Sequence, residues 1–426
     1  MVKIHAGLLI GGDVDIIVHW KILTVKKQRV KNKAEKVRTW LVPHSELTPD
    51  QLKVVKMPLD RHRLVLGSAG SGKTQVLIHR ASYLAKTYGI SPDNFRIFVF
   101  TDMAREYIRP AAQLLGLPEE TVTTFDHWCR LFYEDRKSKD LPRTYINMRI
   151  DFQRIRTEVL LLLEQKKELR NSLEFALVDD GQDLTPEVYK ILSLAARHVT
   201  VFADFQQKIA ETRASEPLIL EALSLKERGS TFSGTYRNAP HVANLASHFI
   251  ADEDARRDYL SQVAAKQKVK AHPLCYVAPS SDKEMSLLAA TLQMRQSMNE
   301  KVGIIVPSSS LIHGLAKDLN GRGVEVEKVI ERDAQNIFHE PFDFGNDIAK
   351  IATFHTAKGL AFDSIFLPHL TENSFSGAKS EARQRMLFVG VARARQWVYL
   401  STVKGKEFKE IDILKAAEAD GHLLLI

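Results

Sequence analysis

Two short stretches of the sequence carry residue types that could hold a phosphate group and a divalent cation. Residues 67–74, GSAGSGKT, match the pattern GxxxxGK[ST] of loops whose backbone N–H groups surround phosphates. Residues 177–183, LVDDGQD, place three carboxylates at the end of the apolar run FALV. A single acid at the end of a strand is commonly a turn or capping residue, but three acids around a glutamine indicate a site.

The glycine loop is predicted to bind the phosphates of a nucleotide. Its glycines let the backbone curl toward phosphate oxygens, and the N-terminus of the following helix adds a favourable dipole. We expect Lys73 to contact the β and γ phosphates and the Thr74 hydroxyl to bind Mg²⁺. A flexible glycine turn is the alternative, but a strand before the loop and a helix after it favour the phosphate site. The predicted contact residues are Gly67, Ser68, Ala69, Gly70, Ser71, Gly72, Lys73 and Thr74.

The acidic stretch is predicted to complete the metal site. Ligands of open parallel sheets bind beyond the carboxyl ends of the strands, where this stretch would lie. Asp179 would then hold Mg²⁺, and Asp180 would orient and deprotonate the attacking water. The two stretches together predict hydrolysis of a nucleoside triphosphate.

Strands and helices must position these residues, and the chain alternates between the two from residue 47 onward. Apolar strands alternating with amphipathic helices are typical of a parallel sheet covered on both faces. The predicted strands of a first α/β domain are 63–66, 95–100, 175–178 and 199–203, and those of a second are 301–307, 348–355, 364–369 and 397–401. Glycine and serine cluster in RGSTFSG, residues 228–234. We therefore predict an N-terminal appendage at 1–45, a first domain at 46–229 and a second at 230–426.

Composition favours an anionic partner and a reducing compartment. The 426 residues carry a formal net charge of +8, an excess that nucleic-acid-binding proteins often show. Cys129 and Cys275 lack the spacing of a zinc site or disulfide framework, so we interpret them as buried thiols. No apolar run reaches transmembrane length and the N-terminus lacks the core of a signal peptide, which predicts a cytoplasmic protein without membrane contact. The basic stretch at 26–38 is interpreted as a solvated helix face, with phosphate contact as the alternative.

The order of the motifs resembles superfamily 1 helicases of the UvrD/Rep/PcrA branch. Between residues 47 and 401 the sequence contains, in the family's order, LTPDQLKVV, GSAGSGKT, FVFTDMA, TVTTFDH, LVDDGQD, VFADFQQKI, TYRNAP, IATFHTAKGLAFD and RQRMLFVGVARAR. The resemblance implies an α/β fold of two RecA-like P-loop NTPase domains with parallel sheets. It also implies ATP and Mg²⁺ as cofactors, bound between the two lobes. The implied partner is a single strand of nucleic acid, with DNA favoured over RNA.

The resemblance implies roles for further residues around the nucleotide. Gln51 is similar to the glutamine that reads adenine, Gln207 to the one that senses the γ-phosphate, and Tyr236 to the tyrosine that stacks on adenine. Arg237 and Arg393 are similar to two arginine fingers, which would stabilise charge on the transferred phosphoryl group. Without the motif context, either arginine would be interpreted as half of a surface ion pair. The predicted catalytic residues are then Lys73, Asp180, Gln207, Arg237 and Arg393.

A second set of residues falls in the motifs that line the family's single-strand track. Stacking platforms together with positive charge are what sequence-independent strand binding requires. For Phe100 and Phe125, packing in the core is an equal alternative. The predicted strand contacts are Phe100, Thr101, Thr124, Phe125, His127, Thr353, His355 and Lys358.

The sequence also departs from the family pattern. Ala361 replaces a glutamate, Asp102 and Met103 stand where Asn and Lys are usual, and Asp180 is one methylene shorter than the usual Glu, which predicts slow hydrolysis. The intervals between motifs are too short for the large 1B and 2B insertions of UvrD and Rep. We therefore expect a compact ATP-driven translocase or helicase-like motor. The alternative is a nucleotide-gated regulatory subunit with a protein partner such as a nuclease.

Overall fold

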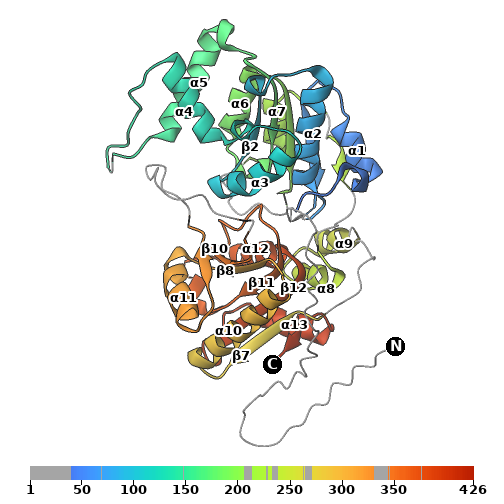
Figure 1. The fold of residues 1–426 in the computed structure, drawn as a ribbon, viewed down its shortest axis with the longest axis vertical. Helices are drawn as coiled ribbons and strands as arrows, with labels where there is room; N and C mark the ends of the chain where they lie inside the picture. Colours follow the sequence, from blue (N-terminus) through green and yellow to red (C-terminus); the bar gives the residue numbers. More distant parts are fainter. Residues whose placement is uncertain are drawn as a thin grey trace, which may run out of the picture. The chain divides into compact units, whose positions relative to one another are not determined.

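The computed structural model describes residues 40–426 except 69, 147, 206–213, 227–228, 233–237, 262, 264–270, 331–343, 345 and 376. Four predicted site residues, Ala69, Gln207, Tyr236 and Arg237, lie outside the described residues, as does the predicted appendage up to residue 39. The described part contains two parallel β-sheets flanked by helices (Figure 1). We call the first sheet with its helices the first lobe, and the second sheet with its helices the second lobe.

The first sheet has six strands in the order β3-β2-β4-β5-β1-β6, all paired in parallel. Its strands are β1 (Arg63–Gly67), β2 (Phe95–Val99), β3 (Val122–Thr124), β4 (Leu173–Val178), β5 (Ala196–Ala203) and β6 (Thr231–Phe232). All four strands predicted for the first domain are present. The short β6 pairs with β1, so this sheet continues to residue 232, past the boundary that we placed at residue 229.

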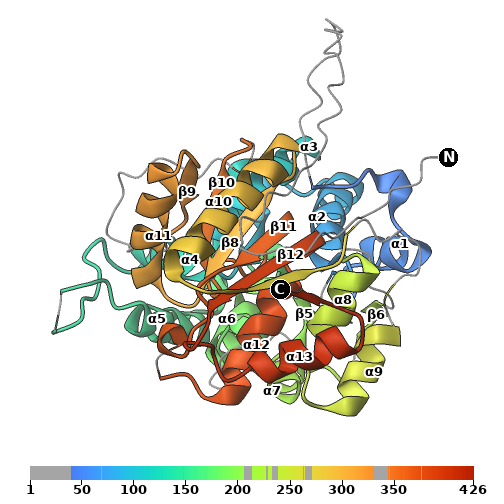
Figure 2. The same ribbon diagram turned by 90° about the horizontal axis from the view of Figure 1, so that it is seen from below.

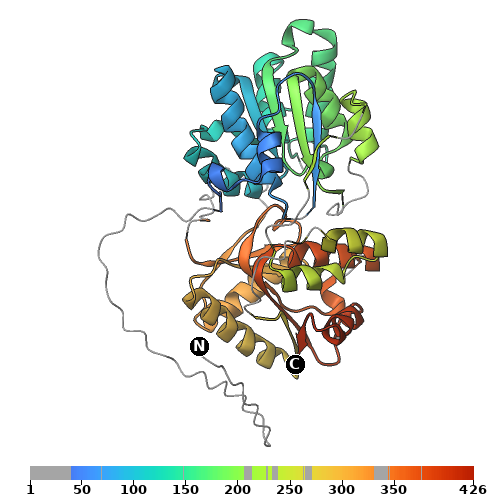
Figure 3. The same ribbon diagram turned by 90° about the vertical axis from the view of Figure 1, so that its right-hand side faces the viewer.

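Side chains of the first sheet alternate between two cores, as the period of an extended backbone requires. In β2, Ile97 and Phe98 enter different cores, one on each face of the sheet. Both faces are therefore buried, which explains the nearly continuous apolar runs of its strands. Figure 3 shows helices on both sides of this sheet. One face carries α1 (Pro49–Val55), α2 (Lys73–Tyr88) and α3 (Asp102–Leu114), and the other α4 (Phe125–Arg136), α5 (Phe152–Gln165), α6 (Pro186–Ala195) and α7 (Glu216–Ala222).

The second sheet has seven parallel strands in the order β13-β7-β12-β11-β8-β10-β9. They are β7 (Leu274–Ala278), β8 (Val302–Val306), β9 (Val326–Lys328), β10 (Ala349–Thr353), β11 (Phe362–Leu367), β12 (Ala394–Val403) and β13 (Leu424–Leu425), and all four predicted strands are among them. One face packs against α10 (Ser281–Ser297) and α11 (Ser309–Gly321), and the other against α8 (Pro240–Ser247), α9 (Glu253–Ser261), α12 (Ser380–Val391) and α13 (Ile411–Ala419) (Figure 2). The predicted α/β fold with two parallel sheets is confirmed.

Among the described residues, no helix combines the length and the apolarity that crossing a bilayer would need.

A buried arginine ties α2 to β5. Arg80 is fully buried, and its guanidinium donates to the carbonyl oxygen of Val54 at 3.0 Å and to Thr200 Oγ1 at 3.3 Å. Its Nη2 also lies 3.2 Å from His198 Nε2. Because a guanidinium only donates, the imidazole accepts at Nε2 and is neutral. Burial, followed by the charges of Arg80, His62 and other neighbours, lowers the pKa of His198 to about 3.

We expect acid to destabilise the first lobe through His198. The ordinary histidine pKa of 6.5 applies when the chain is unfolded, whereas the folded pKa is about 3. Between these values the unfolded chain binds the extra proton, so the free energy of unfolding falls by about 1.4 kcal/mol per pH unit below pH 6.5. Urea unfolding at pH 7 and at pH 5 should show a loss of about 2 kcal/mol from this residue. His198→Gln should reduce the pH dependence, whereas the matched change at the exposed His313 should not; the same slope in both variants would contradict the assignment.

Candidate nucleotide-binding site

The glycine loop joins the end of β1 to the start of α2, as its sequence predicted. Gly70 and Gly72 have φ angles of 81° and 89°, a region that residues with a side chain rarely adopt. An added Cβ at Gly72 would also lie 2.7 Å from Gln51 Nε2. Backbone conformation and a close neighbour therefore both require glycine at position 72.

The Lys73 side chain lies within the loop. Its ammonium donates to the carbonyl oxygens of Gly67 at 2.8 Å and Ser68 at 3.0 Å, and it lies 3.5 Å from Asp204 Oδ2. The side chain is 7% exposed. Its positive charge thus lies next to the backbone N–H groups of the loop. A phosphate bound there would interact with both the ammonium and the N–H groups.

Thr74 and Asp179 form the described part of a candidate metal site. Thr74 Oγ1 donates to Asp179 Oδ2 at 2.8 Å, whereas Asp179 Oδ1 is buried with no hydrogen-bond partner among the described residues. Burial and the charge of Asp180 raise the pKa of Asp179, although Thr74 and Lys73 act in the opposite direction. A divalent cation takes hydroxyl and carboxylate oxygens as ligands and would compensate the buried charge. The donor set therefore fits Mg²⁺.

Asp180 lies just beyond β4 and has φ of 47° in the left-handed region, which Asp tolerates better than most residues. Burial raises its pKa, but the charges of Lys358, Lys73 and Arg393 lower it by more. A hydrogen bond from Gln182 Nε2 at 3.3 Å acts in the same direction. The carboxylate is therefore ionised, as a general base must be.

Groups from both lobes line one small pocket. Arg393, between α12 and β12 of the second lobe, is 2% exposed, and its Nε donates to a main-chain carbonyl oxygen at 3.1 Å. It lines the same pocket as Lys73 and Asp180 of the first lobe. Gly359 of the second lobe lies at the same place, since an added Cβ there would be 3.7 Å from Asp180 Oδ2. The pocket thus combines an ammonium, a carboxylate and a guanidinium.

The Gln51 side chain makes two hydrogen bonds within the protein. Its Oε1 accepts from Thr48 N at 3.0 Å, which completes the capping box of α1, and its Nε2 donates to Ser71 O at 2.9 Å. The side chain is 7% exposed. Gln51 therefore joins the start of α1 to the glycine loop, and the predicted contact with adenine would compete with these two bonds.

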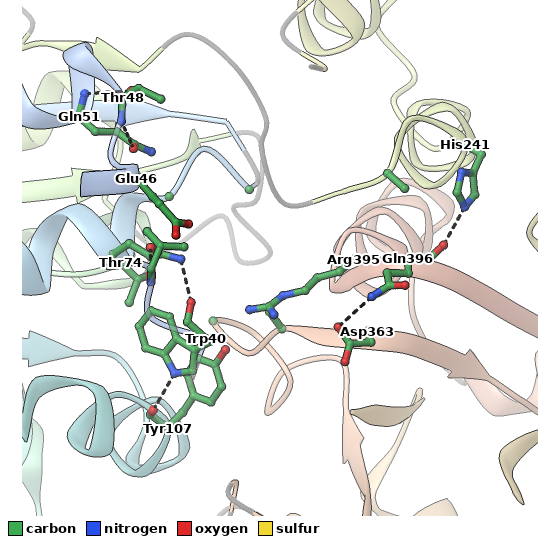
Figure 4. Close-up of a pocket in the computed structure, with 17 residues that line it drawn as sticks. Trp40, Glu46, Thr48, Gln51, Thr74, Tyr107, His241, Asp363, Arg395 and Gln396 are labelled. Atoms are coloured by element: carbon green, nitrogen blue, oxygen red, sulfur yellow. Dashed lines mark hydrogen bonds between the residues drawn. The ribbon is translucent and has the colours of Figure 1, made fainter. Parts of the chain in front are cut away.

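A larger cavity of about 650 Å³ lies beside the glycine loop (Figure 4). This volume is within the range of small-molecule sites. Two of its lining residues, Trp40 and Arg395, were missed by the sequence analysis. Arg395 had a signal, because it follows Arg393 in the same RAR motif, whereas a lone tryptophan ahead of a helix gives none. The lining residues used below are Trp40, Gln51, Gly72, Thr74, Tyr107 and Arg395.

Family models match both halves of this site. The model of the UvrD/REP helicase N-terminal domain matches residues 47–140, which contain the glycine loop. The model of the UvrD-like helicase C-terminal domain matches residues 343–405, which contain Gly359 and Arg393. The two matches support a UvrD-like superfamily 1 helicase. Each model therefore supplies one side of the small pocket.

Relatives of this UvrD-like chain are distant. A probable DNA helicase of Mycoplasma pneumoniae is 22% identical over 447 residues, which cover 81% of each chain. The ATP-dependent DNA helicase PcrA of Bacillus subtilis is 26% identical over 201 residues, which cover 43% of this chain and 26% of PcrA. A solved C-terminal domain of a possible DNA helicase from Lactobacillus plantarum has a TM-score of 0.33 and 17% identity over 45% of this chain and 99% of its own. That score is too low to support a shared fold, and the PcrA match spans about a quarter of PcrA.

Two of the predicted strand contacts of this UvrD-like chain cap helices. The Thr101 hydroxyl accepts from Ala104 N at 3.1 Å at the start of α3, and the Thr124 hydroxyl accepts from His127 N at 3.4 Å at the start of α4. Each cap satisfies an N–H group that the first turn leaves open. The threonines therefore have a structural role whether or not they contact a strand.

The predicted stacking residues lie in different environments. Phe125 is 2% exposed and its ring centroid lies 5.6 Å from that of Phe98, which favours the core-packing alternative. Phe100 is half-buried, and its ring lies 5.8 Å from the ring of the exposed His355 in the second lobe. The hydroxyl oxygens of Thr353, another predicted strand contact, and Thr356 form a hydrogen bond of 2.8 Å. Motifs of the two lobes thus meet at Phe100 and His355.

Lys358 is buried in an ion pair between the lobes. Its Nζ lies 2.6 Å from the Asp183 carboxylate, and the two side chains are 3% and 6% exposed. This is a different environment from the open strand track that we expected. Sequence spacing could not reveal it, because the acid and the lysine are 175 positions apart. The strand contact of Lys358 remains a prediction, as do the roles of Gln207, Tyr236 and Arg237.

Lys358→Met is expected to lower the free energy of unfolding by about 3–5 kcal/mol, because it leaves Asp183 buried without its cation. Adding Asp183→Asn should recover much of that loss, since it removes the stranded charge. Urea unfolding of the single and double variants measures both values. The exposed pair of Lys415 and Asp412 supplies the control, because Lys415→Met should cost less than about 1 kcal/mol. A Lys358→Met loss no larger than that of the control would show that the ion pair does not stabilise the fold.

Proposed function

We propose that the chain is an ATP-driven motor that moves on single-stranded nucleic acid, with DNA as the preferred strand. The observation that carries the proposal is the small pocket in which Lys73 and Asp180 of one lobe meet Arg393 of the other. An arginine supplied across a cleft stabilises the transferring phosphoryl group only while the lobes are together. Hydrolysis would therefore be coupled to opening and closing, the motion that stepping along a strand requires.

Each described residue has a task in this mechanism. Lys73 would exchange its loop carbonyls for oxygens of the β and γ phosphates, which replaces two neutral acceptors by charged ones. Asp180 would orient the attacking water and take its proton, and Arg393 would donate to the γ-phosphoryl oxygens. Mg²⁺ bound at Thr74 and Asp179 would supply neutralisation of the phosphate charge.

The choice of DNA rests on charge and on relatives. The formal net charge of +8 suits a phosphate backbone. The named relatives are a probable DNA helicase and an ATP-dependent DNA helicase. The regulatory-subunit alternative is not favoured, since these names describe helicases.

ATP turnover by the full chain tests the proposal directly. Phosphate release should be measured without nucleic acid and with defined single strands of DNA and RNA, and we expect stimulation that is larger with DNA. Lys73→Ala should reduce turnover by at least about a hundredfold, because the charge opposite the β and γ phosphates is lost. Lys317→Ala, on the exposed surface of α11, is the matched control and should leave turnover unchanged. An absence of turnover under every condition, in protein shown to be folded, would overturn the proposal.

Asp180→Glu should increase turnover and reduce stability. The longer side chain brings the carboxylate toward the attacking water, and a correction on the order of 1 Å can be worth about a hundredfold in rate. Glu is less suited than Asp to the left-handed backbone at φ 47°, which should cost about 1 kcal/mol of folding free energy. Single-turnover hydrolysis and urea unfolding of the same variant measure the two effects. Asp180→Asn, which keeps the length but removes the base, is the control and should be nearly inactive; no gain in turnover with Glu would count against the short-reach explanation.

A further inference from the structure

Residues 40–47, which we call the N-terminal strap, are fixed to the helix that follows the glycine loop. Gln75 Nε2 donates to the carbonyl oxygen of Trp40 at 2.9 Å, and Gln75 Oε1 accepts from Val42 N at 3.2 Å. One turn further along α2, His79 Nε2 lies 3.0 Å from Val42 O and must be the donor, because a carbonyl only accepts. The strap is thus part of the first lobe, although the family model begins at residue 47.

Trp40 presents an aromatic surface at the cavity. Its ring stacks on that of Tyr107 in α3, with centroids 4.9 Å apart and planes at 6°, and its Nε1 donates to the Tyr107 carbonyl oxygen at 3.2 Å. Both residues line the 650 Å³ cavity together with Gly72 and Thr74 of the phosphate site. Figure 4 shows this stacked pair on one side of the cavity and Arg395 extending into it from the second lobe. The ring orientation is held by both stacking and a hydrogen bond.

The two glutamine amides on this wall are already engaged. Gln51 makes hydrogen bonds with Thr48 N and Ser71 O. Both the oxygen and the nitrogen of the Gln75 amide make hydrogen bonds with the N-terminal strap. Reading the edge of a base with either amide would break these bonds, at a cost similar to the gain. Stacking needs no such exchange, and it tolerates every base because each base has a π face.

We propose that Trp40 is a base-stacking residue of the nucleotide site, so that the site holds nucleoside triphosphates by the face of the base and discriminates little between ATP and GTP. The inference rests on the proposed function, because it requires the phosphates to lie in the glycine loop. The base would lie against the surface that Trp40 offers to the cavity. Arg395 would approach from the second lobe, and guanidinium groups also stack on aromatic rings.

Binding of a fluorescent ATP analogue to the full chain tests the role of Trp40. We expect Trp40→Ala to weaken binding about ten- to hundredfold, the loss of one stacked base, and Trp40→Phe to weaken it less than about fivefold. Tyr88→Ala is the control, because Tyr88 is an aromatic residue at the end of α2 that is 50% exposed. Circular dichroism checks that each variant is folded.

Two further measurements decide the inference if Trp40→Ala fails to fold. Unlabelled ATP and GTP should both quench tryptophan emission, and the quench should be lost in Trp40→Phe. Competition against the analogue should give ATP and GTP affinities within about tenfold of each other. A quench that persists in Trp40→Phe, or GTP binding weaker by more than about a hundredfold, would overturn the inference while ATP binding that depends on Lys73 would still support the phosphate site. If the unchanged chain binds no nucleotide, the proposed function itself fails.

Discussion

The structure depends on how the buried carboxylates after β4 are compensated. Asp179 and Asp183 are both buried, and isolated buried charges are costly unless they are paired or bound to a metal. The cations come from both lobes, since Lys73 follows β1 whereas Lys358 and Arg393 belong to the second lobe. One acidic stretch therefore links the proposed catalytic chemistry to the contact between the lobes. A change in charge at the phosphates of a bound nucleotide would act on groups on which that contact depends.

The sheets and the phosphate loop could be predicted because their signals are local. RLVL, FALV and KVGIIVP are apolar runs of strand length, and both faces of a parallel sheet are buried. The glycine pattern combines backbone freedom with a fixed distance to Lys73, so its conformation follows from a few adjacent residues. Short strands such as β6 and β13, two residues each, were not predicted because no hydrophobic period can be read from so few positions.

Contacts between distant residues could not be predicted in the same way. Lys358 has the same sequence context whether it faces a nucleic-acid strand or a buried acid, and only the folded chain shows Asp183 beside it. Gln51 is similar: its position suited contact with a base, but the capping box and the glycine loop use both ends of its amide. Trp40 lies in a stretch that we interpreted as an appendage, and its partners, Gln75 and Tyr107, belong to different helices. Burial decides each of these contacts, and burial is a property of the whole fold.

Only contacts that differ between two arrangements of the lobes can couple nucleotide binding to movement. Lys73 bonds Gly67 and Ser68 within its own loop, so its contact with a phosphate would form in either arrangement. Arg393 belongs to the other lobe and, in the proposed mechanism, would reach the same phosphate only when the small pocket is assembled. The Lys358 and Asp183 pair also crosses between the lobes, but its attraction is offset in part by the desolvation of both charges. Arg393, rather than Lys73, is therefore the residue through which the γ-phosphate would hold the lobes together. After loss of that phosphate, the ion pair of Lys358 and Asp183 would remain between the lobes, and it would hold them together only weakly.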